Sequence, residues 1–155
     1  MRRAADLPRP SRKTAMADKN EIEDTAEPAE QELEAAIAEL FEDYLAGFND
    51  ADAEALIDCF SLPATIWQME KGYVFDDEEE LAENIDALLD ALDKENISYS
   101  EFDVVSAHIS GPTALVTLDW RQESADGESV FEFTCHYHLV SDGEVWRIAM
   151  IVNEQ

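Results

Sequence analysis

Apolar residues recur at spacings of three and four through residues 33–48, with polar residues between them. A period near 3.6 residues places such positions on one face of an α-helix, and the pattern is long enough for about four turns. The apolar positions are Leu33, Ile37, Leu40, Phe41, Tyr44, Leu45 and Phe48. We therefore predict a helix that packs this face against a core.

Two further helices are predicted before the pattern changes. Asp52 can cap a short helix, and Pro63 would end it. Its inward residues are Leu56, Ile57 and Phe60. A short strand is predicted over residues 64–69. The acidic run 76–80 favours the first turn of a third helix, because negative charge is stabilised by the helix dipole there. The apolar face of that helix is Leu81, Ile85, Leu88, Leu89 and Leu92.

From residue 99 onward apolar and polar residues alternate, as they do in β-strands. Strands are predicted over residues 99–109, 114–123, 130–140 and 145–152. The turns between them fall at Gly111-Pro112, Asp126-Gly127 and Asp142-Gly143, and Asp-Gly is favoured in tight hairpins. Helices followed by an antiparallel meander predict an α+β domain over residues 31–155.

Alternation also predicts which side chains of the last three strands face the helices. The inward set is Val116, Leu118, Trp120, Phe131, Phe133, Cys135, Tyr137, Leu139, Trp146, Ile148, Met150 and Val152. The outward set is Asp119, Arg121, Glu132, Thr134, His136, His138, Arg147, Ala149 and Ile151. This outward set is a mixed surface, either exposed to water or in contact with a partner.

The charge balance limits the classes of partner. The chain has 37 Asp and Glu against 10 Lys and Arg, which gives a formal net charge of −27. Such a surface repels phosphate backbones and anionic lipids. The predicted domain has no basic cluster, and the chain has no apolar run of the roughly 18 residues that span a bilayer. We predict a soluble protein that binds neither nucleic acid nor membranes.

The only cysteines, Cys59 and Cys135, are far apart in sequence, so the sequence predicts neither a disulfide scaffold nor a thiolate zinc site. A reducing cytoplasm is the expected location. No glycine-rich phosphate loop or nucleophile elbow is present, and no cofactor is predicted.

Residues 1–30 differ in composition from the remainder of the chain. Half of its 10 Lys and Arg residues precede Met16, and an acidic stretch with few apolar residues follows. Such composition cannot build a core, so we expect a disordered tail. The apolar stretch of a secretory signal is missing, and export is not expected. Met16 is a second plausible start, and under that hypothesis residues 1–15 are a mis-assigned translation start.

The order of the predicted elements and three short strings resemble the nuclear transport factor 2-like (NTF2-like) superfamily. The strings are Tyr44-Leu-Ala-Gly-Phe-Asn-Asp-Ala-Asp52, Cys59-Phe-Ser-Leu-Pro-Ala-Thr65 and Gly143-Glu-Val-Trp-Arg-Ile-Ala149. The superfamily includes SnoaL-like polyketide cyclases and ketosteroid isomerases. The resemblance extends over residues 31–153 and implies a conical barrel of helices and curved sheet around an apolar pocket, with frequent dimerisation.

Of the three functional residues of ketosteroid isomerases, only the tyrosine has the same residue at the matching position of this chain. Their oxyanion-binding tyrosine on the first helix matches Tyr44. Their general base, an aspartate, falls at Gln68, whose amide cannot take up a proton near neutral pH. Their protonated aspartate falls at Cys135. Isomerase chemistry of that kind is therefore not expected from this chain.

Two functional hypotheses follow. In the first, the domain binds a small, mostly apolar molecule, with or without catalysis. The candidate ligand-binding residues are Tyr44, Gln68, Trp120, Cys135, Tyr137 and Met150, with Trp67 at the mouth of the pocket. In the second, the domain is a cyclase, dehydratase or isomerase-like enzyme whose acid or base is Asp103 or His108, brought inward by a one-residue slip in register.

Tyr44 and Cys135 also have an interpretation as ordinary core residues. His136 and His138 project from one strand face at a spacing that metal ligands use. A third ligand is only weakly provided by Glu132 or Asp119, so no metal site is predicted. We interpret the two histidines as part of a polar sheet face.

That face is the expected interface of a homodimer. Arg121 and Arg147 lie on it, and their pairing with Asp119 and Glu132 would reduce the repulsion between two polyanions.

Overall fold

A computed structural model describes residues 33–68 and 70–154 of the chain. The tail expected for residues 1–30 lies outside them. The described residues form three helices and six strands. The helices are α2 (Ala35–Asn49), α3 (Ala53–Ile57) and α4 (Glu78–Lys94). The strands are β1 (Phe60–Gln68), β2 (Lys71–Phe75), β3 (Tyr99–Ser110), β4 (Thr113–Glu123), β5 (Ser129–Ser141) and β6 (Trp146–Glu154). The α+β class is confirmed.

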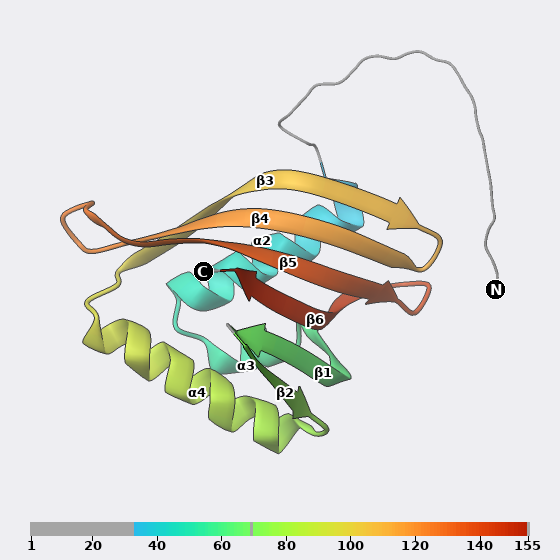
Figure 1. Cartoon of the computed structure of the whole chain (residues 1–155), viewed down its shortest axis with the longest axis horizontal. Coiled ribbons are helices and arrows are strands. Elements are labelled where there is room, and N and C mark those ends of the chain that lie inside the picture. The colour runs from blue at the N-terminus through green and yellow to red at the C-terminus, as the bar shows by residue number, and fades with distance from the viewer. Residues whose placement is uncertain (1–32, 69, 155) are drawn as a thin grey trace, which may run out of the picture. The chain divides into compact units, whose positions relative to one another are not determined.

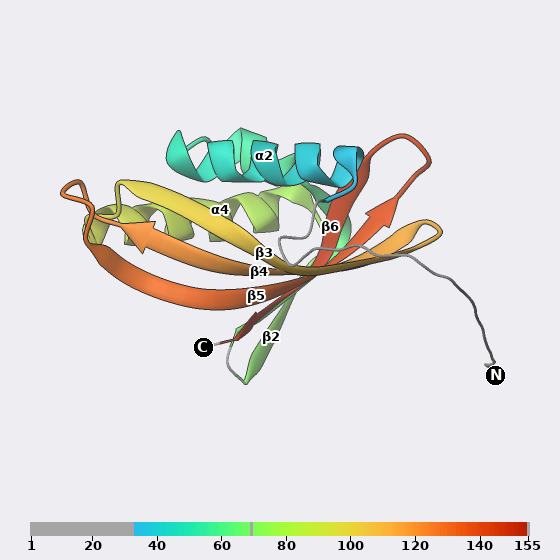
Figure 2. The ribbon, with the colours of Figure 1, turned by 90° about the horizontal axis from the view of Figure 1, so that it is seen from above.

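The strands form one curved sheet in the order β2-β1-β6-β5-β4-β3. All neighbouring pairs are antiparallel except β1 and β6, which run parallel. Figure 1 shows the sheet curving around the helices, and Figure 2 shows α2 and α4 on its concave side. Within the described residues, β2 and β3 are the edge strands of the sheet and do not pair with each other. The expected cone of helices and curved sheet is present without closure into a barrel.

Local sequence signals explain where the helices begin. Asp52 caps α3, and its Oδ1 accepts a hydrogen bond of 3.2 Å from the backbone N–H of Ala55. Asp77 caps α4 in the same way, with a bond of 2.9 Å from Glu80 N–H. Glu78, Glu79 and Glu80 occupy the first turn of α4, as the acidic run predicted.

The core lies between the concave sheet face and the helices. The most deeply buried side chains of the helices are Ile37 and Phe41 of α2, Leu56 of α3 and Leu81 of α4. The predicted inward faces of β4 and β5 are correct: Val116, Leu118, Trp120, Cys135, Tyr137 and Leu139 are all buried. The apolar stripes read from the sequence therefore meet in one core.

The prediction for β6 was wrong beyond Ile148. In the pairing with β5, Ile148 is opposite Leu139 and Met150 is opposite His138, so Ala149 is an extra residue in a β-bulge. The bulge exchanges the faces that follow it. Met150 and Val152 were predicted to face inward, but they lie on the outer face. Ile151, predicted outward, is buried opposite Tyr137.

The region after α3 also differs from the prediction. The helix ends at Ile57, and Phe60 and Pro63 belong to β1 rather than to the helix and its stop. The strand predicted over residues 64–69 is the second half of β1, with Met69 outside the described residues. A strand that the pattern did not predict, β2, pairs with β1 from Ala64 to Gln68.

Candidate functional site

A cavity of about 660 Å³ lies between α4 and the concave face of the sheet, within the range typical of small-molecule sites. Its wall on the helix side comes from α4, through residues such as Leu88 and Ala91, and from Tyr44 and Phe48 of α2. Its sheet side comes from β1, β4, β5 and β6. Five of the six expected ligand-binding residues line the cavity: Tyr44, Gln68, Trp120, Cys135 and Tyr137.

One end of the cavity has a wall of aromatic rings. The Tyr44 ring packs edge-on against Phe48, Trp120 and Tyr137, with centroid distances of 5.0, 6.0 and 6.1 Å. Trp120 stacks on Phe133 at 6.4 Å. The Trp120 Nε1–H donates a hydrogen bond of 2.8 Å to the Tyr137 hydroxyl. The wall is therefore mostly apolar and built of rings in mutual contact, and its indole N–H already has a partner.

The sheet floor of the cavity carries a row of polar and sulfur-containing side chains. Asn153 of β6 pairs in register with Gln68 of β1 on one side and with Cys135 of β5 on the other. All three line the cavity. The Asn153 Oδ1 atom is buried, and no hydrogen-bond donor reaches it within the described residues. Buried acceptors are nearly always bonded, so this oxygen is unusual.

The ionisable groups in the inner part of the cavity are held neutral at physiological pH. Burial raises the pKa of Tyr44 and of Tyr137 well above the usual value for tyrosine. Burial also raises the pKa of Cys135 to about 11. Because a thiolate or phenolate is disfavoured there, these side chains act as neutral polar groups rather than as nucleophiles or bases.

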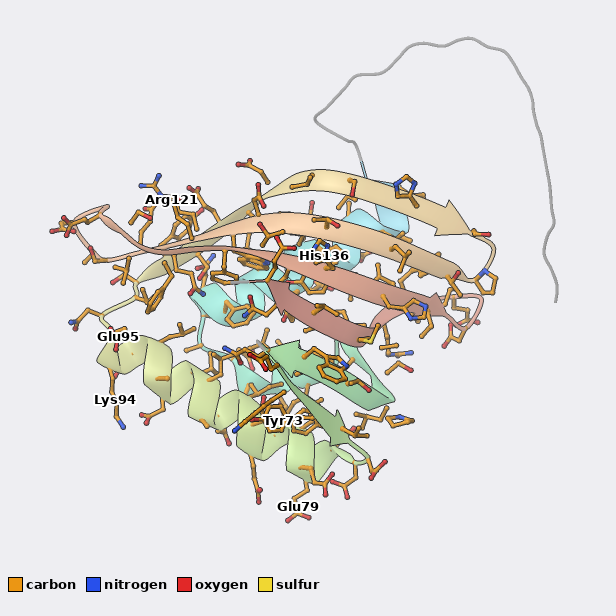
Figure 3. The ribbon with its side chains drawn as sticks, in the orientation of Figure 1. Tyr73, Glu79, Lys94, Glu95, Arg121 and His136 are labelled. Carbon is orange, nitrogen blue, oxygen red and sulfur yellow. The ribbon has the colours of Figure 1, made fainter. Side chains whose placement is uncertain are left out.

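Carboxylates occur only at the rim. Of the described residues that line the cavity, Glu95 and Glu132 carry a carboxylate, both residues are exposed, and none is a histidine. Figure 3 shows Glu95 at the end of α4. Gln122 also lines the cavity and is buried, and its Nε2–H donates a hydrogen bond of 3.2 Å to Ser100 Oγ, which is buried too. That bond pairs one N–H of the Gln122 amide within the protein.

Several predicted site residues lie elsewhere. Met150 is on the outer face and does not line the cavity, because the bulge at Ala149 turns it away. Trp67 is 43% exposed and points outward, packed over Gly72. Asp103 and His108 of β3 pair with outward positions Asp119 and Leu115 of β4, so the register slip proposed for the catalytic alternative is not present at these two residues.

Sequence reasoning missed Asn153 and Ile151 as cavity residues. Residues 148–152 form an unbroken apolar run, which fits a strand in either phase. Only the pairing with β5 shows where the phase changes. The single hint in the sequence was Asn153 itself, a polar residue after an apolar run in the last strand.

The outer face carries a smaller polar arrangement around His136 (Figure 3). Thr117 Oγ1 lies 2.9 Å from His136 Nδ1, and Glu154 Oε2 lies 3.3 Å from His136 Nε2. These are cross-strand contacts on an open surface. Over residues 33–68 and 70–154, no three metal-binding side chains gather closely enough to hold an ion, and none of the helices is long and apolar enough to cross a membrane.

The open curved sheet, the three helices on its concave side and the cavity between them define an NTF2-like α+β domain. The family described as NTF2-like protein (DUF6841) matches residues 10–155. The chain belongs to that family. The match begins well before residue 31, where we placed the start of the domain. No curated protein matches this sequence.

Solved structures show the same fold. An NTF2-like protein of unknown function from Shewanella oneidensis superposes with a TM-score of 0.63 at 13% identity, covering 78% of this chain and 98% of that one. A ketosteroid isomerase-like protein from Erwinia carotovora superposes with a TM-score of 0.59 at 20% sequence identity. The match covers 77% of this chain and 92% of that one. An NTF2-like protein of unknown function from Shewanella baltica superposes with a TM-score of 0.55 at 22% sequence identity. The match covers 77% of this chain and 90% of that one. At these identities the likeness concerns the fold alone.

Proposed function

We propose that this domain binds a small, neutral and largely apolar molecule in the cavity between α4 and the sheet. The observation that carries the proposal is a cavity of about 660 Å³ whose inner surface joins an aromatic wall to a few uncharged polar groups. That combination is typical of small-molecule sites, in which apolar surface provides affinity and isolated polar groups provide orientation. Tyr44, Gln68, Trp120, Cys135 and Tyr137 are the proposed ligand-contacting residues.

The charge distribution supports a neutral ligand. The described residues lining the cavity include no lysine or arginine to pair with an anion, and the exposed Glu95 and Glu132 at the rim add to the net charge of −27. An anionic ligand would be repelled on approach and left unpaired inside. A cation would find no buried carboxylate among the residues that line the cavity.

Binding is tested by measuring thermal stabilisation and Trp fluorescence with a panel of neutral aromatic, polyketide-like and steroid-like compounds. A ligand at one hundred times its Kd should stabilise the fold by about 2.7 kcal/mol. If no compound of the panel stabilises the protein or changes its fluorescence, the proposal is wrong.

A matched pair of variants locates the ligand. Ala91 lines the cavity from α4, whereas Asp86 is an exposed position of the same helix outside the lining. Ala91→Trp should fill the cavity and abolish binding. Asp86→Trp adds the same side chain to the same helix and should leave binding unchanged. Unchanged affinity in Ala91→Trp would move the ligand to another part of the molecule.

The second candidate function is a cyclase, dehydratase or isomerase-like enzyme acting on a small hydrophobic substrate. With Asp103 and His108 facing outward, the acid or base would have to be Glu95 or Glu132, the carboxylates that line the rim. An enzyme of this kind should turn over a substrate that the cavity binds, and Glu95→Gln or Glu132→Gln should lower kcat while leaving Kd nearly unchanged. If both variants turn over the substrate as fast as the unchanged protein, neither carboxylate is the catalytic acid or base.

We also propose that two copies of the chain associate through the outer sheet face. The face keeps Arg121 and Arg147, although both already have partners in the same chain: Arg121 Nε lies 2.7 Å from Glu123 Oε2 and Arg147 Nη1 lies 3.5 Å from Asp142 Oδ2. These pairs neutralise part of the face of a strongly acidic domain. Ile151, which the sequence placed on this face, does not belong to it.

Light scattering at tens of micromolar protein tests the dimer. Arg147→Glu should weaken it most at low salt, where charges are least screened. Lys94→Glu makes the same charge change on α4, away from the sheet, and serves as the control. A monomer mass for the unchanged protein in about 0.15 M salt would refute the dimer. The cytoplasmic location expected from the unpaired Cys59 and Cys135 stays a prediction.

A further inference from the structure

We propose that Gln122 orients the ligand of this cavity, and that the ligand carries a hydroxyl group whose O–H donates a hydrogen bond to the Gln122 side-chain oxygen. The inference rests on the proposed function, to which it adds a specificity-determining residue. It narrows the ligand class to neutral ring compounds that bear a hydroxyl group on one edge.

Gln122 is a buried polar side chain that the protein holds in place. Ser100 and Gln122 are the buried polar residues of the described part of the chain, at 2% and 5% exposure. They pair across β3 and β4, and the Gln122 Nε2–H donates its bond of 3.2 Å to Ser100 Oγ. The other carboxamides that line the cavity from β1 and α4, Gln68 and Asn84, are exposed. A polar group that is already fixed binds a ligand at a lower cost in side-chain entropy.

Ser100, the partner of Gln122, is itself fixed by the end of α2. Its backbone N–H donates a hydrogen bond of 2.7 Å to Asn49 Oδ1, and Asn49 Nδ2–H donates one of 3.1 Å to its backbone oxygen. These two bonds tie α2 to β3 through the backbone of Ser100, and the Gln122 amide takes no part in them. A ligand bond therefore accounts for a polar side chain where an apolar pair could serve the fold.

The side-chain oxygen of Gln122 is open to the cavity. Within the described residues no donor bonds to Gln122 Oε1, yet the one fully enclosed side-chain oxygen or nitrogen without a partner there is Asn153 Oδ1. Gln122 Oε1 is therefore accessible, and the space beside it is the cavity that Gln122 lines. Asn153 Oδ1 is closed off even from water, so it cannot meet a ligand.

The aromatic residues beside Gln122 indicate where the ring of the ligand lies. Phe131 is opposite Gln122 in the pairing of β4 and β5, and Phe133 is opposite Trp120. The two rows are about 7 Å apart along the strands, a distance that a fused pair of rings can span. Phe131 is 39% exposed and lines the cavity, so its ring is available for contact. A bicyclic ring against Phe131 and Phe133 would place a hydroxyl on its edge at Gln122.

The test uses two probes of nearly the same shape, 2-naphthol and 2-methylnaphthalene, in which a methyl group replaces the hydroxyl. Equilibrium dialysis against the full chain measures the ratio of the Kd of the methyl compound to that of the alcohol. In Gln122→Leu this ratio should fall about tenfold from its value in the unchanged protein, because one net hydrogen bond is lost from the alcohol complex alone. Comparing ratios cancels the difference in hydrophobicity between the probes.

Asn84→Leu is the matched control, because it removes a carboxamide that lines the same cavity from α4. It should keep the ratio of the unchanged protein. Ser100→Ala leaves the Gln122 amide present but no longer held, and it should lower the ratio by less than Gln122→Leu does. An unchanged ratio in Gln122→Leu, or an equal fall in Asn84→Leu, would overturn the role of Gln122.

A third probe tests the direction of the bond. The ether 2-methoxynaphthalene accepts a hydrogen bond but donates none, so its Kd relative to that of 2-methylnaphthalene should not change in Gln122→Leu. A tenfold change for the ether would show that the amide nitrogen of Gln122 faces the ligand. That result would overturn the proposed donor on the ligand.

A double variant keeps the test valid if Gln122→Leu is unstable. Gln122→Leu leaves the Ser100 hydroxyl without its partner, whereas Gln122→Leu with Ser100→Ala removes both partners, which can be nearly neutral for stability. The double variant should show the same tenfold fall. If both probes bind the unchanged protein with a ratio that does not depend on Gln122, this inference is wrong and the cavity remains a binding site. If neither probe binds, the result counts against both the inference and the proposed function.

Discussion

Two hollows in the described part of the chain differ in charge. The cavity beneath α4 has a volume of about 660 Å³, and its inner side chains are uncharged. A second hollow of about 360 Å³ lies along α2, α3 and the hairpin between β5 and β6. Its lining includes the carboxylates Glu39, Asp43, Asp50, Asp52, Asp58 and Glu144. We call this second hollow the acidic groove.

The comparison shows how burial controls the protonation of a site. The carboxylates of the acidic groove are exposed, so water solvates their charge. The phenols and the thiol beneath α4 have raised pKa values because water is excluded there. The same strongly acidic sequence therefore forms a neutral binding cavity and a charged groove.

The aromatic wall of the cavity should dominate stability. Trp120 is 4% exposed and packs against Tyr44, Phe48, Phe102 and Phe133. Trp120→Ala should lower the free energy of unfolding by about 3–5 kcal/mol. Urea denaturation measures the change. A loss below about 1 kcal/mol would mean that the wall repacks and is not rigid.

The floor of the acidic groove should tolerate no added volume at Gly47. A Cβ built there would lie 2.8 Å from Leu56 Cδ2 and Cγ, where α2 meets α3. Gly47→Ala should therefore cost about 1–3 kcal/mol in spite of the better helix propensity of alanine. Adding Leu56→Val in a double variant should recover part of that loss, which a double-mutant cycle from urea denaturation measures. Strict additivity of the two changes would contradict the contact.

Each hollow contains one cysteine, and their alkylation rates should differ. Burial raises the pKa of Cys135 to about 11 and that of Cys59, which lies near Asp43 and Asp58, to about 12. The thiolate is the reactive form, so at pH 8 both thiols should react far more slowly than an unfolded cysteine, and Cys135 about tenfold faster than Cys59.

Mass spectrometry after iodoacetamide treatment measures the two rates. Both rates should rise about tenfold for each pH unit up to the respective pKa, because the thiolate fraction rises by that factor. A bound cavity ligand should protect Cys135 and leave Cys59 unchanged. Protection of Cys59 instead would place the ligand in the acidic groove.

The smallest effect is expected for single charges in the acidic groove. Asp43 is exposed, and no hydrogen bond or ion pair of its side chain is found in the described part of the chain. Asp43→Asn should change stability by no more than about 0.5 kcal/mol, in the stabilising direction because it relieves repulsion. The gain should shrink as salt is raised from 0.05 to 0.5 M. A destabilisation at low salt would show that Asp43 has an attractive partner.

Local signals predicted the helices and the two central strands well. The apolar period of residues 33–48, the cap at Asp52 and the acidic start of α4 all correspond to the helices found. The alternation in β4 and β5 gave the correct faces because both strands pair without a bulge between Val116 and Trp120. The predicted cavity residues on these elements, Tyr44, Trp120 and Tyr137, follow from that regularity.

The errors lie where the sequence pattern is ambiguous. The apolar run 148–152 is compatible with either phase, so the bulge at Ala149 and the inward position of Asn153 were not predictable. Strand β2 is short and contains Gly72, and its residues Tyr73 and Val74 are exposed, so no apolar alternation marked it. Its pairing with β1 depends on a neighbouring strand rather than on its own composition.

Local periodicity, capping and composition are enough to predict the α+β class, the helix boundaries to within a few residues, the faces of the central strands and the strong negative charge. The set of side chains that meet in the cavity depends instead on tertiary contacts. Strand pairing fixes the phase of β6, and burial between α4 and the sheet fixes the protonation of Tyr44, Tyr137 and Cys135. The phase of β6 and the protonation of these side chains both depend on residues that are distant in sequence, so a local sequence pattern cannot predict them.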